Sequence, residues 1–337
     1  MTANKPQNTT IIDTISQGYI AINRRPWLLI LPILLNVFLL YGAQISLGPL
    51  AAQYAAATQS LRPAGEAGAE FDQLLLDVAH ADIRLQLAFF NCIPSYAAYT
   101  LSYIGAACNP TGLSVVQPLP PSITSQRGSV LQMSSIADAA LLIVFINAVM
   151  LPLSAAFLSQ IAEAVRNDQA SLVTRLRRTG HATLSMLGYI AIIGGIGLLL
   201  GLPFLFLVGL LAAVNPALAG LGASLIVIVS FWVSVYTGFA REAIVVSGVG
   251  PLRAIHASFN IVRQNFWGTL GFLVLAFIIT VGAGLIWQTL ATSTAGLIAA
   301  IAGSAYIGSG LWAARMAFYH ERLRRWQAAM PVVRSSA

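Results

Sequence analysis

Long apolar stretches, separated by short polar segments, dominate the chain. Residues 179–240 and 264–314 contain no Asp, Glu, Lys or Arg. About 20 apolar residues cross a bilayer as a helix, so each stretch is long enough for two spans. We expect turns at Asn215-Pro216 and near residues 289–294. Together with two further apolar runs, the pattern predicts six spans, over residues 27–47, 139–162, 184–212, 217–239, 268–290 and 293–314.

The composition supports a membrane protein. Hydrophobic residues make up 57% of the 337 residues and charged residues 9%, whereas soluble domains carry about 25% charged residues. The mean hydropathy is +0.78. We therefore predict an all-α, polytopic integral membrane bundle of about six transmembrane helices with added interfacial helices. It would form one membrane domain over 1–337, with five of the spans in 139–320.

The positions of the basic residues predict the orientation. Every Lys and Arg except Arg62, Arg84 and Arg127 falls on the side of the two termini in the six-span arrangement. The positive-inside rule then makes both termini cytoplasmic. Residues 48–137 become an extracytoplasmic segment, and 321–337 become a cytoplasmic tail. The formal charge of +7 is explained by this orientation and not by nucleic-acid binding. We expect a multi-pass protein of a bacterial plasma membrane.

Two segments that precede spans have the period of an amphipathic helix. Residues 251–266 carry an apolar seam, and residues 1–26 carry a similar one as a cytoplasmic interfacial helix. The corresponding residues are Ile15, Tyr19, Ile22 and Trp27 in the first segment and Ile255, Phe259, Val262 and Trp267 in the second. One interpretation is a threefold repeat of a surface helix plus two spans, with 169–178 as a shorter third copy. The alternative is that any amphipathic helix before a span has this pattern.

The extracytoplasmic segment leaves one question of topology open. An amphipathic helix is expected over 71–85. The following residues, 85–107, are apolar enough for a seventh span, but their polar side chains and Pro94 favour an interfacial segment or a re-entrant hairpin. Such a hairpin would let Cys92 and Cys108, the two cysteines of the chain, form a disulfide. A straight spanning helix would keep them about 24 Å apart.

The segment Arg241-Glu242-Ala243-Ile244, with residues 248–267 and the fifth span after it, resembles a group of uncharacterised six-span membrane families. These families are related to the membrane domain of glycerophosphoryl diester phosphodiesterases. The resemblance covers less than a quarter of the chain and implies a six-span helical fold. These 337 residues hold no soluble barrel that could be the phosphodiesterase domain, so that activity is not implied.

The sequence contains no recognisable catalytic set. Its four histidines, His80, His181, His256 and His320, are scattered, and neither HExxH nor GxSxG occurs. Ionisable residues such as Glu163, Glu242 and Arg315 are expected at the ends of spans and not at their centres, which argues against ion-coupled transport. We therefore predict no catalytic residues, no cofactor and no metal site.

Two arginine clusters next to spans are the candidate binding residues. Guanidinium groups at a membrane surface attract anionic lipid headgroups with about 1 kcal/mol each. The alternative is that they only anchor the topology. The clusters consist of Arg175, Arg177 and Arg178 and of Arg322, Arg324 and Arg325.

Three function classes follow. The first is a non-enzymatic membrane protein that organises membrane lipids or an unidentified membrane-protein partner. The second is a transporter of a small neutral solute or lipid, based on spans interrupted at Pro32, Pro152 and Pro203. A polar cavity lined by Asn36, Asn147 and Ser154 would favour transport. An intramembrane enzyme is the third.

Overall fold

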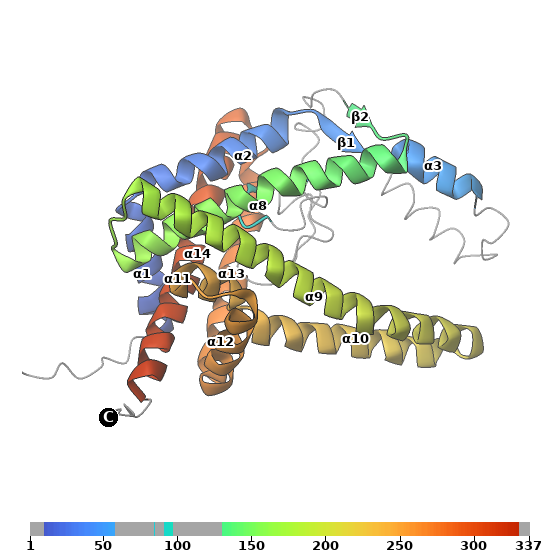
Figure 1. The fold of residues 1–337 in the computed structure, drawn as a ribbon. Coiled ribbons are helices and arrows are strands. Elements are labelled where there is room, and N and C mark those ends of the chain that lie inside the picture. The colour runs from blue at the N-terminus through green and yellow to red at the C-terminus, as the bar shows by residue number, and fades with distance from the viewer. Residues whose placement is uncertain (1–9, 58–83, 85–90, 97–129, 330–337) are drawn as a thin grey trace, which may run out of the picture. The chain divides into compact units, whose positions relative to one another are not determined.

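The chain folds into long apolar helices, as expected. The computed structural model describes residues 10–57, 84, 91–96 and 130–329. Within these ranges five stretches are long and apolar enough to cross a membrane: Ile136–Arg166, Leu172–Ala212, Ala217–Ser247, Phe266–Leu290 and Thr294–Ala328. A sixth is added if two consecutive helices near the N-terminus count as one broken span. The expected all-helical membrane fold is confirmed (Figure 1).

The turns between paired spans occur where the sequence placed them. Helices α9 (Leu172–Val214) and α10 (Pro216–Thr237) meet at Asn215. The Asn215 side chain accepts a hydrogen bond from Ala217 N at 2.9 Å, and Pro216 is the first residue of α10, an arrangement that starts a helix efficiently. Helices α13 (Phe266–Leu290) and α14 (Thr294–Ala329) are separated by a similarly short turn. Helix α8 covers Ile136–Arg166.

The first predicted span, 27–47, is too long. The structure has a short 3₁₀ helix, η1 (Pro26–Leu29), followed by α2 (Ile30–Tyr41), and then strand β1 (Gln44–Ser46). The helix ends early because Arg84 donates hydrogen bonds to the carbonyls of Phe38 and Leu39, at 3.0 and 2.5 Å. A basic side chain on the last carbonyls is a typical helix stop. Together η1 and α2 rise only about 24 Å.

Shorter helices accompany the spans. Among them are α1 (Ile11–Asn23), α11 (Ala240–Ser247) and α12 (Pro251–Gln264). Gly248 ends α11 in the left-handed conformation, with φ 64°, which glycine adopts at little cost. Helix α12 stops at Gln264 and not at residue 266, because Asn265 leaves the helical conformation. The expected surface helix at 169–178 is not separate, since α9 runs on without interruption.

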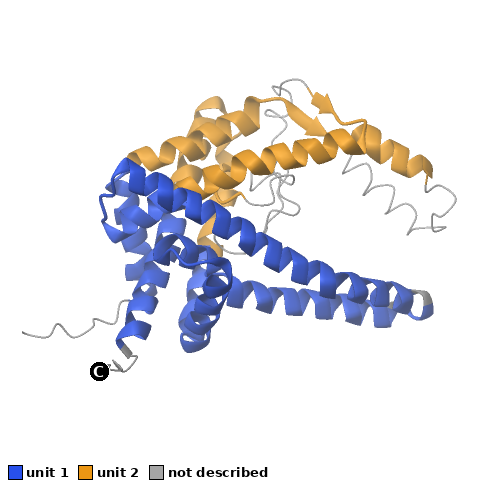
Figure 2. Ribbon diagram, viewed as in Figure 1, with its two compact units in different colours: residues 1–25, 158–276, 310–337 blue, residues 26–157, 277–309 orange. Residues whose placement is uncertain are grey.

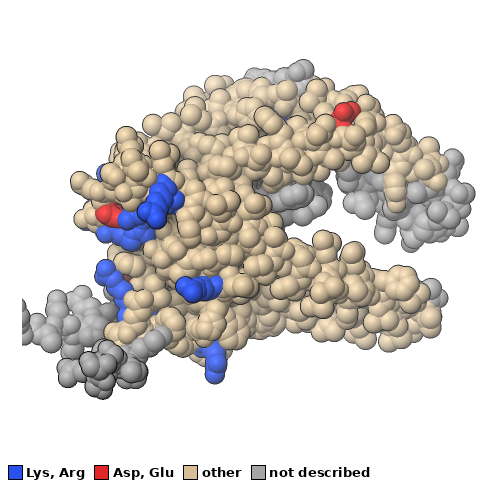
Figure 3. Space-filling view, in the orientation of Figure 1, with Lys and Arg blue, Asp and Glu red and all other residues tan. Residues whose placement is uncertain are grey.

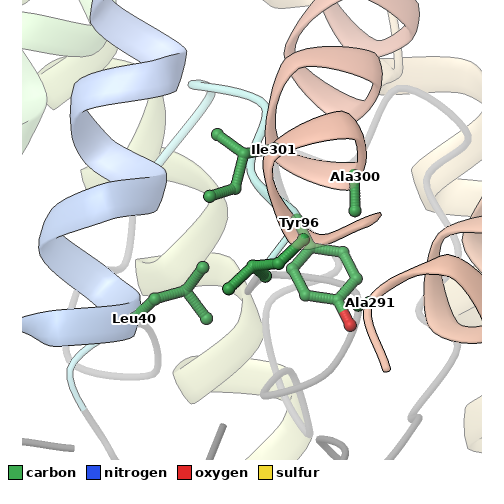
Figure 4. Packing of buried hydrophobic residues seen from close by; sticks show 6 residues of the cluster. Leu40, Tyr96, Ala291, Ala300 and Ile301 are labelled. Carbon is green, nitrogen blue, oxygen red and sulfur yellow. The ribbon is translucent and has the colours of Figure 1, made fainter. Parts of the chain in front are cut away.

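The chain forms two compact units, each built from distant segments (Figure 2). Unit 1 contains residues 1–25, 158–276 and 310–337, and unit 2 contains residues 26–157 and 277–309. In unit 2, β1 pairs in parallel with β2 (Val130–Gln132), with Ile45 opposite Leu131. Helix α3 (Gly48–Ala57) follows β1. Unit 2 has a core around Tyr96, which packs among Leu40, Ala291, Leu297, Ala300 and Ile301 (Figure 4).

Residues 91–95 of unit 2 are not helical, and residues 92–95 are buried. Their backbone is held by side chains of neighbouring helices. Cys92 N donates to Ser154 Oγ at 3.2 Å, and Tyr96 N donates to Asn36 Oδ1 at 2.5 Å. A single straight helix over 85–107 is therefore excluded at this point. The re-entrant hairpin stays a prediction, because most of that segment lies outside the described residues, as do most of the expected helix 71–85 and residues 330–337 of the tail.

Unit 1 has an aromatic core. The rings of Phe239 and Phe272 both stack on Phe318 of α14, with centroids 5.5 and 5.0 Å away. Around them, α14 is buried continuously from residue 311 to 319, and α11 from 240 to 245. In contrast, α9 and α10, which run side by side in Figure 1, expose most of their apolar side chains. That surface is suited to contact lipid tails.

Candidate functional site

The arginines gather in one of the two units. Every described arginine except Arg84 lies in unit 1. On the face drawn in Figure 3, Lys and Arg atoms collect over the part of unit 1 that holds α12 and the start of α9, and the far ends of α9 and α10 carry none. Some of these arginines hold the fold through ion pairs, and others face outward.

Glu163 is the centre of the first charged cluster. This α8 residue accepts hydrogen bonds from Arg175 Nε and Nη2 at 2.9 and 2.7 Å and from Arg25 Nη1 at 3.0 Å. Its side chain is only 4% exposed. Arg25 also donates to the carbonyl of Asp168 at 2.6 Å. One carboxylate thus joins the N-terminal segment to α8 and α9, and paired geometry of this kind is among the stronger protein hydrogen bonds.

The turn between α8 and α9 is held by a second ion pair. Arg178 Nη1 lies 2.7 Å from Asp168 Oδ2, and this hydrogen bond holds the pKa of Asp168 below its usual value. Asn167 in the same turn has φ 53°, which asparagine tolerates better than most residues. Nearby, Arg166 donates to the carbonyls of Val245 and Val246 at 3.2 and 2.8 Å and so caps the end of α11.

A third cluster is fully buried. Arg315 Nε donates to Glu242 Oε1, and Arg315 Nη2 donates to the carbonyl of Gly238, both at 2.5 Å. The guanidinium carbons of Arg241 and Arg315 each lie 5.4 Å from the ring centre of Trp312, within the range of cation–π attraction. Ser258 of α12 completes the region by donating to Tyr236 O and accepting from Phe239 N. These contacts fix α11 against α12 and α14.

The six arginines predicted to contact lipid now fall into two groups. Four have a protein partner: Arg175 and Arg178 are paired as described, Arg325 pairs with Glu321, and Arg322 lies over the ring of Phe318. Arg177 and Arg324 are exposed and form no ion pair with the described residues. Lipid contact stays a prediction for all six, and Arg177 and Arg324 are the best placed.

Three further arginines share this outward position. Like Arg177 and Arg324, they are exposed and make no ion pair within the part of the chain that the structure describes. Each described carboxylate of unit 1 is already paired with an arginine, except Asp13, which caps α1. We call the five residues the outward arginines: Arg24, Arg177, Arg253, Arg263 and Arg324.

The polar residues expected to line a transport path in unit 2 have structural partners. Asn36 is buried and bridges Pro32 O and Tyr96 N. Asn147 donates to Ile143 O of its own helix, and Ser154 accepts from Cys92 N. Cys92 itself is buried. Its pairing with Cys108 stays a prediction, because Cys108 lies outside the described residues.

The ion pair between Glu242 and Arg315 was not predicted from the sequence. Both residues were placed at the ends of spans, where headgroups or water would satisfy them, but both are almost completely buried. A signal was present: Arg315 stands in a run of apolar and small residues, where a charge needs a partner. Across the described ranges, His, Cys, Asp and Glu side chains form no group of three that could hold a metal ion. The absence of a catalytic site stays a prediction.

The chain was also compared with known proteins. No family model, curated protein or solved structure matches it. The resemblance of residues 241–267 to six-span membrane families thus rests on those residues alone, and the functional interpretation rests on the geometry described above.

Proposed function

We propose that this multi-pass membrane protein is not an enzyme and that it gathers anionic lipids around the arginine-rich part of unit 1. The observation that supports this most directly is the set of outward arginines. A guanidinium group that is exposed and not paired with a carboxylate can donate two parallel hydrogen bonds to a phosphate.

The different contacts of the arginines support the proposal. Arg25, Arg175, Arg178 and Arg315 are held by Glu163, Asp168 or Glu242 and stabilise the fold. Several of the remaining arginines lie on or beside elements that continue directly into spans, as Arg263 does before α13. Such positions lie at the depth of the lipid phosphates.

The transport alternative receives less support. Its expected lining residues, Asn36, Asn147 and Ser154, are engaged with backbone groups. The helices that contain Pro152 and Pro203 run on through these prolines, as kinked helices do when neighbours satisfy the backbone. No contact among the described residues favours an intramembrane enzyme, and we do not propose one.

The test compares lipid retention in matched variants. In one variant the five outward arginines are changed to Gln, and in the other they are changed to Lys. Both proteins and the wild type are purified in mild detergent, and bound phospholipids are identified by native mass spectrometry. Since each surface charge contributes about 1 kcal/mol, or about fivefold in affinity, the Gln variant should lose most of its anionic phospholipid. The Lys variant should keep it.

The thermal unfolding midpoint of each variant serves as the folding control. Equal anionic-lipid content in the Gln variant and the wild type, at unchanged unfolding midpoints, would refute the proposal. Loss of lipid in both variants would mean that guanidinium geometry, and not charge alone, is needed.

A further inference from the structure

Two helices of unit 1, α1 and α12, share a pattern of apolar and buried positions. The sequence pairs their apolar positions when 240 is added to each number, as for Tyr19 and Phe259. In the structure, the helices also begin at matching positions, Ile11 and Pro251. Their C-caps, Arg24 and Asn265, differ from this register by a single residue.

The buried faces match in the same register. Every buried residue of α12 corresponds to a buried residue of α1. The matching pairs are Thr14 and Ala254, Gly18 and Ser258, Ala21 and Ile261, and Ile22 and Val262.

The small residue at the middle of each buried face touches the backbone of another helix. A Cβ atom at Gly18 would lie 2.4 Å from Ala314 N of α14, so this position has room only for glycine. At the equivalent place, Ser258 bonds to Tyr236 O and Phe239 N, at the junction of α10 and α11. The middle of each helix therefore contacts the backbone of another helix, and the opposite face of the helix points away from the core.

The outward faces share an exposed apolar position, although their charges differ, with Asp13 in α1 where α12 has Arg253. Ile12 is 69% exposed and Leu252, its counterpart, 70%. In α12 the exposed apolar edge continues through Phe259 to Trp267, which is 79% exposed at the start of α13. Arg253 and Arg263 lie exposed on the same helix. This combination of an apolar edge with flanking arginines is typical of helices that lie in the headgroup region of a bilayer.

The short connection to α13 determines the depth of α12 relative to the membrane. Only Asn265 separates it from α13, whose 25 residues are apolar enough to span. The end of α12 must therefore lie where α13 enters the membrane, at the depth where Trp and Arg side chains collect.

We infer that α1 and α12 are two copies of one membrane-surface element, and that the outward face of each inserts into the headgroup region of a phospholipid bilayer. The apolar edge contacts the upper acyl chains, and the arginines contact the phosphates. The inference deepens the proposed lipid-gathering function, but the insertion of the apolar edges does not require anionic headgroups.

The experiment uses single cysteines in the full chain, in a background with Cys92→Ser and Cys108→Ser. Leu252→Cys and Ile12→Cys report the outward apolar edges. Gln264→Cys and Gln17→Cys are exposed controls on the same two helices. Each variant is labelled with the fluorophore NBD and reconstituted into vesicles of phosphatidylcholine, with or without phosphatidylglycerol. Quenching by shallow doxyl lipids is then compared with quenching by aqueous iodide.

We expect the labels at 252 and 12 to be quenched severalfold more by doxyl lipid than the labels at 264 and 17, in both kinds of vesicle. Iodide should show the reverse order. Equal iodide quenching at 252 and 264 would overturn the insertion of α12. Lipid quenching at 252 without lipid quenching at 12 would overturn the equivalence of the two helices.

A label at 252 that is shielded from both quenchers would mean that a protein surface covers α12, and this too would overturn the inference. Insertion in neutral vesicles together with no retention of anionic lipid would refute the proposed function and leave the surface element intact. The two ideas can therefore fail separately.

Discussion

Arg315 donates a 2.5 Å hydrogen bond to Glu242, 73 positions away in the sequence, and the side chains are 1% and 0% exposed. The pair joins α14 to the first turn of α11, and both side chains are closed off from the protein surface. Because each charge needs the other there, the two residues act as one structural unit.

Breaking this pair should destabilise the protein more than removing it. Glu242→Leu leaves a buried guanidinium without its carboxylate, which typically costs about 3–5 kcal/mol. The double variant Glu242→Leu, Arg315→Met should recover most of that loss. Unfolding midpoints in detergent measure both effects. A double variant as unstable as Glu242→Leu would mean that the bond from Arg315 to the Gly238 carbonyl is the more important contact.

Gly18 and Gly180 form a matched pair of glycine substitutions in unit 1. At Gly18 a Cβ would lie 2.4 Å from Ala314 N, whereas at Gly180 it would meet nothing within 4 Å. Gly18→Ala should therefore push α1 away from α14 and lower stability by about 1–3 kcal/mol. Gly180→Ala, in the interior of α9, should raise it by about 0.5–1 kcal/mol. Similar unfolding midpoints for the two variants would contradict the close approach of α1 to α14.

The Asp168–Arg178 pair predicts a dependence of stability on pH. The pKa of Asp168 is lowered, mainly by the hydrogen bond from Arg178. The stabilisation that comes from a lowered carboxylate pKa is fully present above the pKa of the unfolded state, about 3.9. It is lost as the pH falls through the pKa of the folded state.

The wild type should therefore unfold at a higher temperature than Asp168→Asn at pH 7, and the two should converge under acid conditions. The difference should be small and should shrink with added salt, because both side chains are partly exposed. Arg178→Gln should give the same loss at pH 7, and a difference that persists at the lowest pH would count against the pair.

The orientation can be tested on described, exposed positions. Ala52 of α3 is expected outside and Gln169, between α8 and α9, inside, from the distribution of arginines. With both native cysteines replaced, a membrane-impermeant maleimide should label Ala52→Cys on intact cells. It should label Gln169→Cys only after permeabilisation. Labelling of Gln169→Cys on intact cells would reverse the proposed orientation.

The sequence was sufficient to predict most spans, because a charge-free run of adequate length leaves few alternatives. It also placed the turn at Asn215-Pro216, where local chemistry decides. The early end of α2 was not predictable, since it depends on Arg84, more than 40 positions away. The same is true of the outward arginines. Arg175 and Arg177 are equivalent in sequence, and only the position of Glu163 makes one structural and leaves the other exposed.

The length of α9 has a consequence for the membrane itself. From Ala182 to Val214 this helix carries no Asp, Glu, Lys or Arg, and it rises about 50 Å over that stretch. A typical hydrocarbon core is about 30 Å thick, so the helix must tilt, bend at Pro203 or thicken the bilayer around it. Lipids with longer acyl chains would reduce this mismatch. The protein would then select its neighbours by chain length as well as by headgroup, and it would concentrate in the thicker regions of a membrane.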